Sequence, residues 1–478
     1  MKVAIIHYHL EPGGVTRVIE NTLEAFASSE YAIETVVLTG RKYTGDRIQE
    51  YRVVEGLDYA TSYQALDPRL LLERIKDAAR SSLGSPPDLW HFHNHSLGKN
   101  PSLTKATAKL AQDGERILLH PHDFAEDGRP SNFKALEKVY QNAYPAGSKI
   151  SYAALNNRDR LFLEKLLDET NSEVHLLANP IQENELSMVG QGVKTSIPAN
   201  LILYPVRAVR RKNLGELALL SAAHPDKFFA NSLGPTNPAF LPQFERWKTF
   251  ASHHSLPLTY GIGNQVDCSF PELVASTEAI ISTSVAEGFG LGFLEPWGFG
   301  KSLCGRNLPE ITGDFAQQGV LLDNLYNRIE LNLDLMEDSK TLHTRIEDCL
   351  INFFHDYGEE LPEGAVQEGF DSIVRDNLVD FGRLDETLQE ELISAVLSSP
   401  QVKESIRKQS SIECLANTIV EENAKAVQNN FSMHAYGKKL FEIYQSLLSA
   451  PEENARFANG RKLLKQFLSP ARINLLRA

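Results

Sequence analysis

The chain has 478 residues, of which 42% are hydrophobic and 23% are charged, and it carries a formal net charge of −14. This composition is typical of a folded globular protein, and the length predicts two domains because a single core seldom extends beyond about 250–300 residues. The acidic balance excludes nucleic acid and anionic membranes as the main partners.

Two further features of the sequence predict its compartment. No apolar run reaches the roughly 18 residues that a membrane span needs, and the N-terminus enters an apolar strand directly instead of a signal peptide. The four cysteines form no C-x-x-C pair, which favours reduced thiols. We therefore expect a cytoplasmic protein without a membrane span.

Residues 2–7 form an apolar run that is typical of a first, buried parallel strand. A glycine turn follows, and Gly13, Gly14 and Arg17 lead from it into a helical pattern. A strand, a glycine turn and a helix in this order are how a doubly wound α/β domain places a ligand loop at the carboxyl ends of its strands. An ordinary strand-to-helix turn has the same pattern, so this segment alone leaves both interpretations open.

Histidines mark the ends of the next two strands that we predict. Residues 88–95 alternate so that His91, His93 and His95 share one face, and His122 follows the next apolar strand. Three histidines on one face are compatible with a metal site, but carboxylate or thiolate ligands at a recognisable spacing are absent. We therefore expect no metal and interpret these histidines as hydrogen-bonding walls of a pocket.

Other apolar segments complete the first predicted domain, which extends over residues 1–182. Strands are expected at residues 35–38, 150–154 and 174–178. The polar run at residues 182–198 then predicts a linker between the two domains.

The second predicted domain extends over residues 199–450 and begins with an apolar strand at 200–205, which a cluster of cations follows. Arg207 and Lys212 lie at its two ends. A departing diphosphate gains negative charge as its bond breaks, and fixed cations stabilise that charge. A solvated helix start also carries cations, so the pattern is compatible with either role.

A glycine turn at residues 287–290 separates an apolar strand at 279–281 from a helical stretch that carries Glu295. A glycine loop that enters a helix N-terminus offers backbone N–H groups and the positive end of a helix dipole to a phosphate. Glu287 and Glu295 flank this loop, and ionised carboxylates bind the hydroxyls of a ribose or hexose. Turns of this kind are also common in α/β proteins without a ligand.

The order strand, Glu287-Gly-Phe-Gly-Leu, Leu294-Glu295 and Leu308-Pro-Glu-Ile resembles the E-x7-E signature of retaining glycosyltransferases of the GT-B fold, in particular family 4. This family has two Rossmann-like domains. The sequence departs from the family pattern at two positions: Gly292 stands where proline is usual, and Pro296 stands where alanine is usual.

The resemblance implies a role for each matching residue. Arg207 and Lys212 would neutralise the diphosphate of a nucleotide-sugar donor, Glu295 would bind its ribose, and Glu287 would bind the sugar hydroxyls. His122 would contact the transferred sugar from the first domain, and neither a metal nor a cofactor would be needed. The implied catalytic residues are therefore His122, Glu287, Arg207 and Lys212, and the implied donor-binding residues are Gly13, Gly14, Arg17, Gly288, Phe289, Gly290, Leu291 and Glu295.

Residues 337–430 interrupt the expected second domain. They contain 20 Asp or Glu against 8 Lys or Arg, and so they account for most of the net charge. Apolar residues such as Leu388, Leu392 and Val396 recur at helical spacing, which predicts an acidic helical insertion, for example an oligomer contact or an acceptor-side wall. Residues 451–478 would form a C-terminal helix that crosses back to the first domain, as in the family.

The expected function is therefore retaining, metal-independent transfer of a hexose from a nucleotide-diphosphate sugar to a hydroxyl acceptor. Two alternatives stay open from the sequence. One is a non-catalytic nucleotide-sugar-binding or interaction protein of the same fold, and the other is a nucleotide-sugar epimerase. The base, the sugar and the acceptor are not readable from the motifs.

Overall fold

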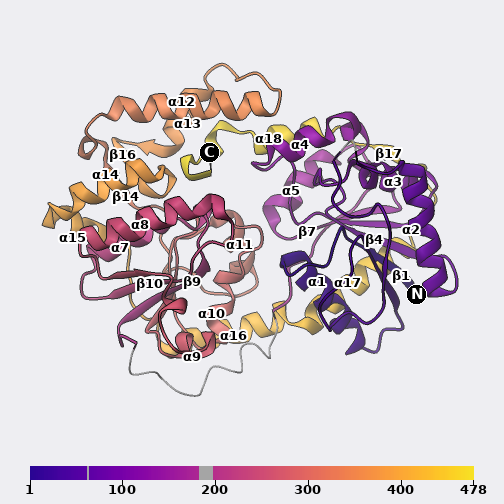
Figure 1. The fold of residues 1–478 in the computed structure, drawn as a ribbon, viewed down its shortest axis with the longest axis horizontal. Coiled ribbons are helices and arrows are strands. Elements are labelled where there is room, and N and C mark those ends of the chain that lie inside the picture. The colour runs from indigo at the N-terminus through magenta and orange to yellow at the C-terminus, as the bar shows by residue number, and fades with distance from the viewer. Residues whose placement is uncertain (62–63, 182–196, 478) are drawn as a thin grey trace. The chain divides into compact units, whose positions relative to one another are not determined.

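The computed structural model describes residues 1–61, 64–181 and 197–477, and the chain divides into two compact units (Figure 1). Unit 1 comprises Met1–Pro180 and Phe431–Ser469, and unit 2 comprises Ile181–Asn430 and Pro470–Ala478. Most of the expected linker, residues 182–196, lies outside the described residues.

The chain returns to unit 1 at Phe431, although the sequence placed residues 431–450 in the second domain. Helix α17 (Met433–Leu448) packs against helix α1 (Gly14–Ala27). Tyr436, Leu440 and Tyr444 of α17 lie four residues apart and are fully buried in the core of unit 1. This apolar stripe needs a partner surface, which α1 and the sheet provide. The last segment, Pro470–Ala478, belongs to unit 2, although we expected it to cross to the first domain.

Unit 1 is built on a parallel sheet of seven strands in the order β3-β2-β1-β4-β5-β7-β8. Every neighbouring pair in it is parallel, as a doubly wound α/β domain requires. Its strands are β1 (Lys2–Ile6), β2 (Glu34–Thr39), β3 (Tyr51–Val53), β4 (Leu89–His93), β5 (Ile117–His120), β7 (Ile150–Ala154) and β8 (Val174–Leu176).

Helices connect these strands, and several begin at a recognisable cap. The Asp67 carboxylate accepts hydrogen bonds from the first turn of α2, and the Asn100 side chain does the same for α3. A short antiparallel pair, β6 (Pro145–Ala146) with β17 (Arg456–Phe457), ties the C-terminal part of the unit to its sheet. The remaining helices are α2 (Pro68–Leu83), α3 (Pro101–Gln112), α4 (Pro130–Leu136), α5 (Asn157–Leu166) and α18 (Arg461–Phe467).

Unit 2 contains a second parallel sheet, with five strands in the order β11-β10-β9-β12-β13. Its strands are β9 (Leu201–Arg207), β10 (Phe228–Leu233), β11 (Leu258–Tyr260), β12 (Ala279–Ser282) and β13 (Leu303–Gly305). The helices that connect or follow them are α7 (Leu214–Ala223), α8 (Leu241–His253), α9 (Phe270–Ala275), α10 (Glu295–Gly298) and α11 (Pro309–Gln317).

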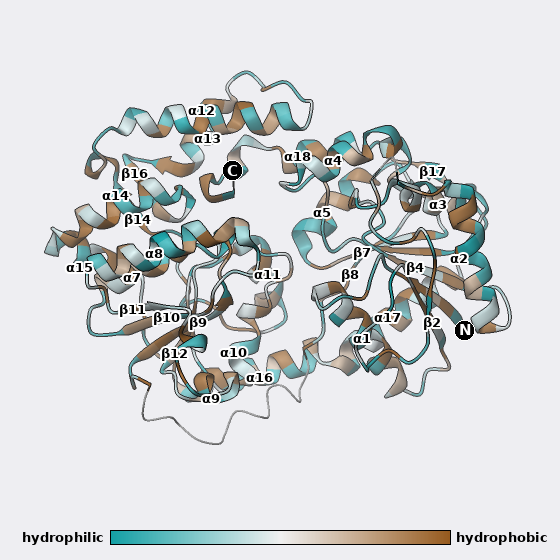
Figure 2. Ribbon diagram, viewed as in Figure 1, coloured by the Kyte–Doolittle hydropathy of each residue, from teal (hydrophilic) through white to brown (hydrophobic). Residues whose placement is uncertain are grey.

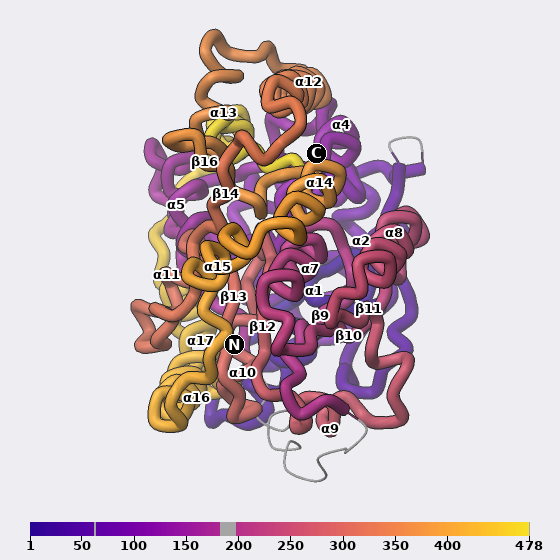
Figure 3. The backbone as a smooth tube through the Cα atoms, turned by 90° about the vertical axis from the view of Figure 1, so that its left-hand side faces the viewer, coloured from indigo at the N-terminus to yellow at the C-terminus, as the bar shows by residue number. Residues whose placement is uncertain are grey.

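The inserted segment, residues 337–430, is mainly helical but also contributes strands β15 and β16 to a small antiparallel sheet with β14. Helices α14 and α15 pack directly on α7, so the segment covers one face of unit 2 (Figure 3). Its elements and the preceding strand are β14 (Glu330–Asn332), α12 (Ser339–Asp356), α13 (Ala365–Ile373), β15 (Val374–Arg375), β16 (Leu378–Asp380), α14 (Glu386–Leu397), α15 (Pro400–Gln409) and α16 (Asn417–Phe431).

Hydrophobic residues concentrate in the two parallel sheets, where every residue of β4, β5, β7 and β12 is buried (Figure 2). Burial on both faces explains why β5 and β12 are nearly continuous apolar runs in the sequence, whereas β4 includes the buried His91 and His93. Among the helices that the structure describes, none combines the length and the apolar character that a membrane crossing requires.

Candidate functional site

The order of strands in unit 2 creates a switch point between β9 and β12. These strands are neighbours, but the chain leaves β9 toward β10 and leaves β12 toward β13 on the opposite side. Loops that leave two such strands at their carboxyl ends diverge, and the crevice between them is where open α/β sheets bind ligands. The predicted cations follow β9, and the glycine turn follows β12.

Lys212 and Glu287 meet at this switch point. The Lys212 ammonium donates a hydrogen bond to Glu287 Oε1, and the Ser284 hydroxyl donates to the same oxygen at 2.6 Å. The side chains of Lys212 and Glu287 are only 16% and 12% exposed. A pair that is this enclosed is oriented by its surroundings and is not a solvated surface contact.

The residues from Arg210 to Asn213, which we call the cation loop, hold Lys212 in place. Arg210–Lys212 form one turn of 3-10 helix, and Asn213 has a left-handed backbone with φ 51°. The Thr283 hydroxyl lies 3.0 Å from both the Lys212 and the Asn213 carbonyl oxygens, which share its one hydrogen. The Asn213 side chain caps α7, because it accepts from the Glu216 N–H and donates to the Glu216 carboxylate at 2.9 Å.

The other residues implied for the donor occupy the same edge of the sheet. Arg207 is the last residue of β9 and is exposed. Gly288 is also exposed, and a Cβ atom added there would meet no described atom within 4 Å. Gly290 has φ +95°, and a Cβ atom there would lie 2.8 Å from the Ile311 side chain, so the backbone conformation and the packing both favour glycine.

The helix after the glycine turn carries Glu295, as the sequence predicts, and it is very short. Leu291–Phe293 form a single 3-10 turn, and Glu295 is the first residue of α10, which ends at Gly298. Pro296 in the first turn favours a helix that starts at this point and cannot continue the preceding turn. The expected contribution of a helix dipole is therefore small, and Glu295 lies half-buried at the start of α10 instead of inside a longer helix.

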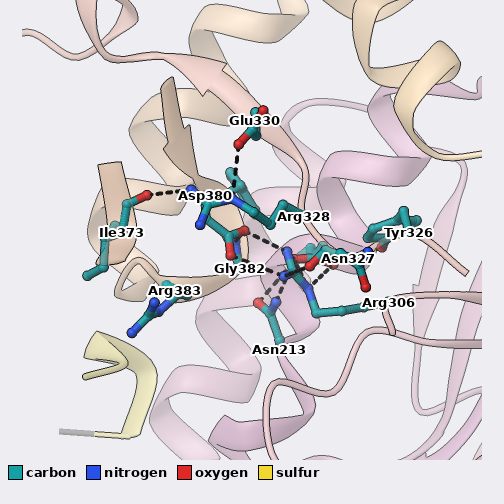
Figure 4. A network of polar contacts seen from close by, with 12 residues as sticks. Asn213, Arg306, Tyr326, Asn327, Arg328, Glu330, Ile373, Asp380, Gly382 and Arg383 are labelled. Atoms are coloured by element: carbon teal, nitrogen blue, oxygen red, sulfur yellow. Dashed lines mark hydrogen bonds and ion pairs between the residues drawn. The ribbon is translucent and has the colours of Figure 1, made fainter. Parts of the chain in front are cut away.

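A buried ion network is joined to the cation loop through Asn213 and Glu216 (Figure 4). The Arg306 guanidinium donates to the Glu216 carboxylate at 2.6–3.1 Å and to Asp380 at 2.9 Å. The Tyr326 hydroxyl donates to Glu216 at 2.8 Å. Burial disfavours the charged guanidinium, but the two carboxylates outweigh it and raise the pKa of Arg306 well above its usual range.

Unit 1 has its own switch point, between β1 and β4. Gly13 is the N-terminal cap residue of α1, which begins at Gly14, and both glycines are exposed. A Cβ atom added at Gly14 would meet no described atom within 4 Å, so the loop backbone is open. Arg17 lies in the first turn of α1 and is exposed.

His122 lies beyond β5 at the same edge of the sheet of unit 1. Asn94, which has a left-handed backbone with φ 56°, accepts hydrogen bonds from the His122 and Asp123 N–H groups at 2.6 and 3.2 Å. A hydrogen bond of 2.8 Å joins the His122 ring to His93. Burial, reinforced by nearby histidines, lowers the pKa of His122 to about 3, so the ring is neutral at physiological pH.

His91, His93 and His120 form a buried cluster whose ring nitrogens lie within 4.8 Å of one another. Hydrogen bonds join His91 to Tyr444 at 2.8 Å and to His120 at 3.2 Å. The His93 ring stacks on His91 with an interplanar angle of 28° and lies tilted by 35° to His120. Ligand lone pairs lie in the ring plane, and rings stacked in this way do not direct them at one point. We therefore interpret the cluster as a hydrogen-bonded core.

His95 allows a direct test of how buried histidines affect stability. Its ring nitrogen Nε2 donates to the Ala143 carbonyl at 2.8 Å, and burial lowers the pKa of His95 to about 4. Because the unfolded chain has the ordinary pKa near 6.5, the stability that neutral His95 provides is present above that pH and is lost as the pH falls toward 4.

We expect His95→Gln, whose amide N–H replaces Nε2–H, to reduce this dependence. Between pH 6.5 and 5, the unfolding free energy of the wild type should fall by about 1.6 kcal/mol more than that of the variant. Denaturant unfolding of both proteins at several pH values measures this difference. The exposed His253 offers a control, and a pH slope for His95→Gln equal to that of His253→Gln would contradict the prediction.

Several residues that shape the site were not predicted from the sequence. Asn213 had a local signal, because an Asn followed three residues later by Glu216 is an N-cap pattern. Ser284 and Asn94 carried no distinctive signal, since a single Ser or Asn in a loop is common. The role of Arg306 could not be predicted from the residues around it, because its two partners lie 90 and 74 residues away in the chain.

The comparisons with known proteins support the fold. No protein family model matches this chain. The chain is 25% identical to the mannosylglucosyl-3-phosphoglycerate synthase of Petrotoga mobilis, in an alignment that covers 99% of this chain and 98% of that enzyme.

Two solved structures are similar along nearly their whole length. The sucrose-phosphate synthase of Thermosynechococcus elongatus matches with a TM-score of 0.53 and 13% identity, covering 94% of this chain and 99% of that one. A glycosyltransferase of Rickettsia africae matches with a TM-score of 0.50 and 14% identity, covering 94% and 98%. The chain therefore has the GT-B glycosyltransferase fold, as the E-x7-E resemblance predicted.

Proposed function

We propose that this protein is a retaining glycosyltransferase that moves a hexose from a nucleotide-diphosphate sugar to a hydroxyl acceptor without a metal ion. The observation that carries the proposal is the Lys212–Glu287 pair at the switch point of unit 2. It brings a fixed cation and a carboxylate together in the crevice where this fold binds nucleotides. The full-length similarity to a synthase of a glycosylated compound supports it.

Each residue has a distinct task in this proposal. Lys212 and the exposed Arg207 stabilise the negative charge that gathers on the leaving diphosphate, which is the task of a divalent cation in other transferases. The N–H groups from Gly288 to Leu291 hold phosphate oxygens, and Glu295 binds the ribose. Glu287 accepts hydrogen bonds from sugar hydroxyls with the oxygen that Lys212 does not occupy.

The residues of unit 1 act on the sugar and the acceptor. Neutral His122 contacts the transferred sugar, and Asn94 fixes its backbone. The open Gly13-Gly14 loop and Arg17 bind phosphate or acceptor groups at the start of α1. Because the relative is named for a product that contains phosphoglycerate, we propose that the acceptor is anionic.

A thermal-shift panel tests the proposal. UDP, GDP and ADP, and their glucose and mannose esters, are added to the full chain with EDTA and then with Mg²⁺. A ligand at 100 times its dissociation constant stabilises its site by about 2.7 kcal/mol, which raises the melting temperature measurably. We expect one base to stand out equally with EDTA and with Mg²⁺.

Other outcomes of the panel have clear meanings. A shift that requires Mg²⁺ would contradict the metal-independent mechanism. Binding of a nucleotide sugar that is then neither transferred nor hydrolysed would favour a non-catalytic binding protein. Conversion of the bound sugar to its epimer, detected by chromatography, would favour an epimerase.

A further inference from the structure

The inserted segment makes direct contact with the cation loop. Gln389 of α14 is completely buried, and its amide donates to Asn213 Oδ1 at 2.9 Å and to the Phe381 carbonyl at 3.2 Å. Asn213 directly follows Lys212 and holds the left-handed turn that ends the loop. The amide of Gln389 therefore binds the side chain of the residue whose left-handed backbone ends the loop, a conformation that an ordinary residue seldom adopts.

A second contact fixes the other end of the loop. Arg210 donates two parallel hydrogen bonds of 2.9 Å to the Glu386 carboxylate, one turn before Gln389 on α14. This fork-to-carboxylate geometry is among the strongest side-chain pairings. The two contacts hold both ends of the loop that presents Lys212.

The close packing of α14 on α7 sets the positions of Gln389 and Glu386 relative to the cation loop. A Cβ atom added at Gly215, in the first turn of α7, would lie 2.1 Å from Gln389 Oε1 and 2.5 Å from the Trp247 ring. The glycine therefore allows the two helices to approach closely enough for the Gln389 amide to reach Asn213. Asp380, at the end of β16, is joined to α7 through Arg306 and Glu216, so a second contact links this segment to α7.

We propose that α14 of the inserted segment positions the cation loop, with Gln389 and Glu386 as positioning residues for donor binding. This inference rests on the proposed function, because it assumes that Lys212 binds the donor diphosphate. It gives the insertion a role in the reaction beyond covering unit 2. Both residues act on donor binding through their contacts to the side chains of Arg210 and Asn213, which stand at the two ends of the loop.

The test uses two variants that keep the volume of the side chain. Gln389→Met removes the amide but retains an unbranched side chain of similar length, and Glu386→Gln removes the charge that faces Arg210. The matched control is Glu390→Gln, on the same helix, because Glu390 also binds an arginine with a distance of 2.6 Å but faces Arg246 of α8 and not the loop.

Calorimetry measures the binding of UDP, GDP and ADP and of the corresponding monophosphates to the full chain. We expect both variants to bind the preferred diphosphate about tenfold more weakly, with the monophosphate changed less than about twofold, since one hydrogen bond or ion pair of this kind is worth roughly one order of magnitude. Glu390→Gln should bind both like the wild type. Hydrogen exchange of the Lys212 and Asn213 amides should be faster in Gln389→Met than in the control.

Each alternative outcome has a distinct meaning. If the variants lose the same affinity for the diphosphate and for the monophosphate, α14 stabilises unit 2 in general and the inference is overturned. Wild-type diphosphate affinity in both variants, with unchanged amide exchange, would also overturn it while leaving the proposed function intact. If the wild type binds none of the six nucleotides, the proposed function fails and the inference fails with it.

Discussion

Replacing Lys212 with alanine is expected to lower turnover by about 10²–10³, the range found when one fixed group that stabilises transition-state charge is removed. The ammonium is enclosed, held by the cation loop and oriented by Glu287. Such a group requires little rearrangement when negative charge develops, so its removal affects the transition state more than the substrate.

Binding measurements separate this role from a general effect on the fold. We expect Lys212→Ala to weaken nucleoside diphosphates more than monophosphates, measured by calorimetry beside donor-consumption kinetics. Arg211→Ala is the matched control, because Arg211 is the adjacent cation and is exposed. An equal loss of affinity for diphosphates and monophosphates would show that Lys212 does not bind the diphosphate.

Replacing Arg306 with methionine is expected to destabilise unit 2 by about 3–5 kcal/mol, because it leaves two buried carboxylates without their cation. The side chains of Arg306 and Asp380 are each 4% exposed, and that of Glu216 is fully buried. The Arg306 guanidinium bridges both acids, so its loss breaks the contact between β13, α7 and β16 at once (Figure 4).

Urea unfolding followed by far-ultraviolet circular dichroism measures this loss. Arg246→Met provides the control, because it breaks an arginine–glutamate pair in which the Arg246 side chain is 46% exposed. An exposed pair contributes about 0–1 kcal/mol, so the control should unfold close to the wild type. A loss at Arg306 no greater than that of the control would show that the buried network contributes little.

Much of the fold could be predicted from local patterns. Several strands of the two parallel sheets are largely apolar runs, and the boundaries expected for them lie within two residues of those in the structure, for example at β7, β9 and β12. The predicted helix that carries Glu295 is present as α10, but it is only four residues long because Pro296 lies in its first turn and cannot continue the preceding turn. The predicted end of the second domain at residue 450 was wrong, because the chain already returns to unit 1 at Phe431. The apolar face of α17 does not show which of the two units the helix covers.

The sequence by itself determined the chemical groups of the candidate site and their order along the chain. A glycine turn after an apolar strand, a carboxylate at Glu287 and a cation at Lys212 are local features, and the parallel order of strands brings such loops to one edge of a sheet. These features depend on spacing and residue type, which a single sequence contains.

Only the tertiary structure decided what holds these groups in place. Gln389 and Asn213 are 176 residues apart in the chain, and the structure brings them within hydrogen-bonding distance. Arg306 gains its two carboxylates in the same way. Such contacts depend on how α14 packs on α7, and packing is set by the shapes of whole elements. A residue therefore gives no local sign of the distant partner that positions it.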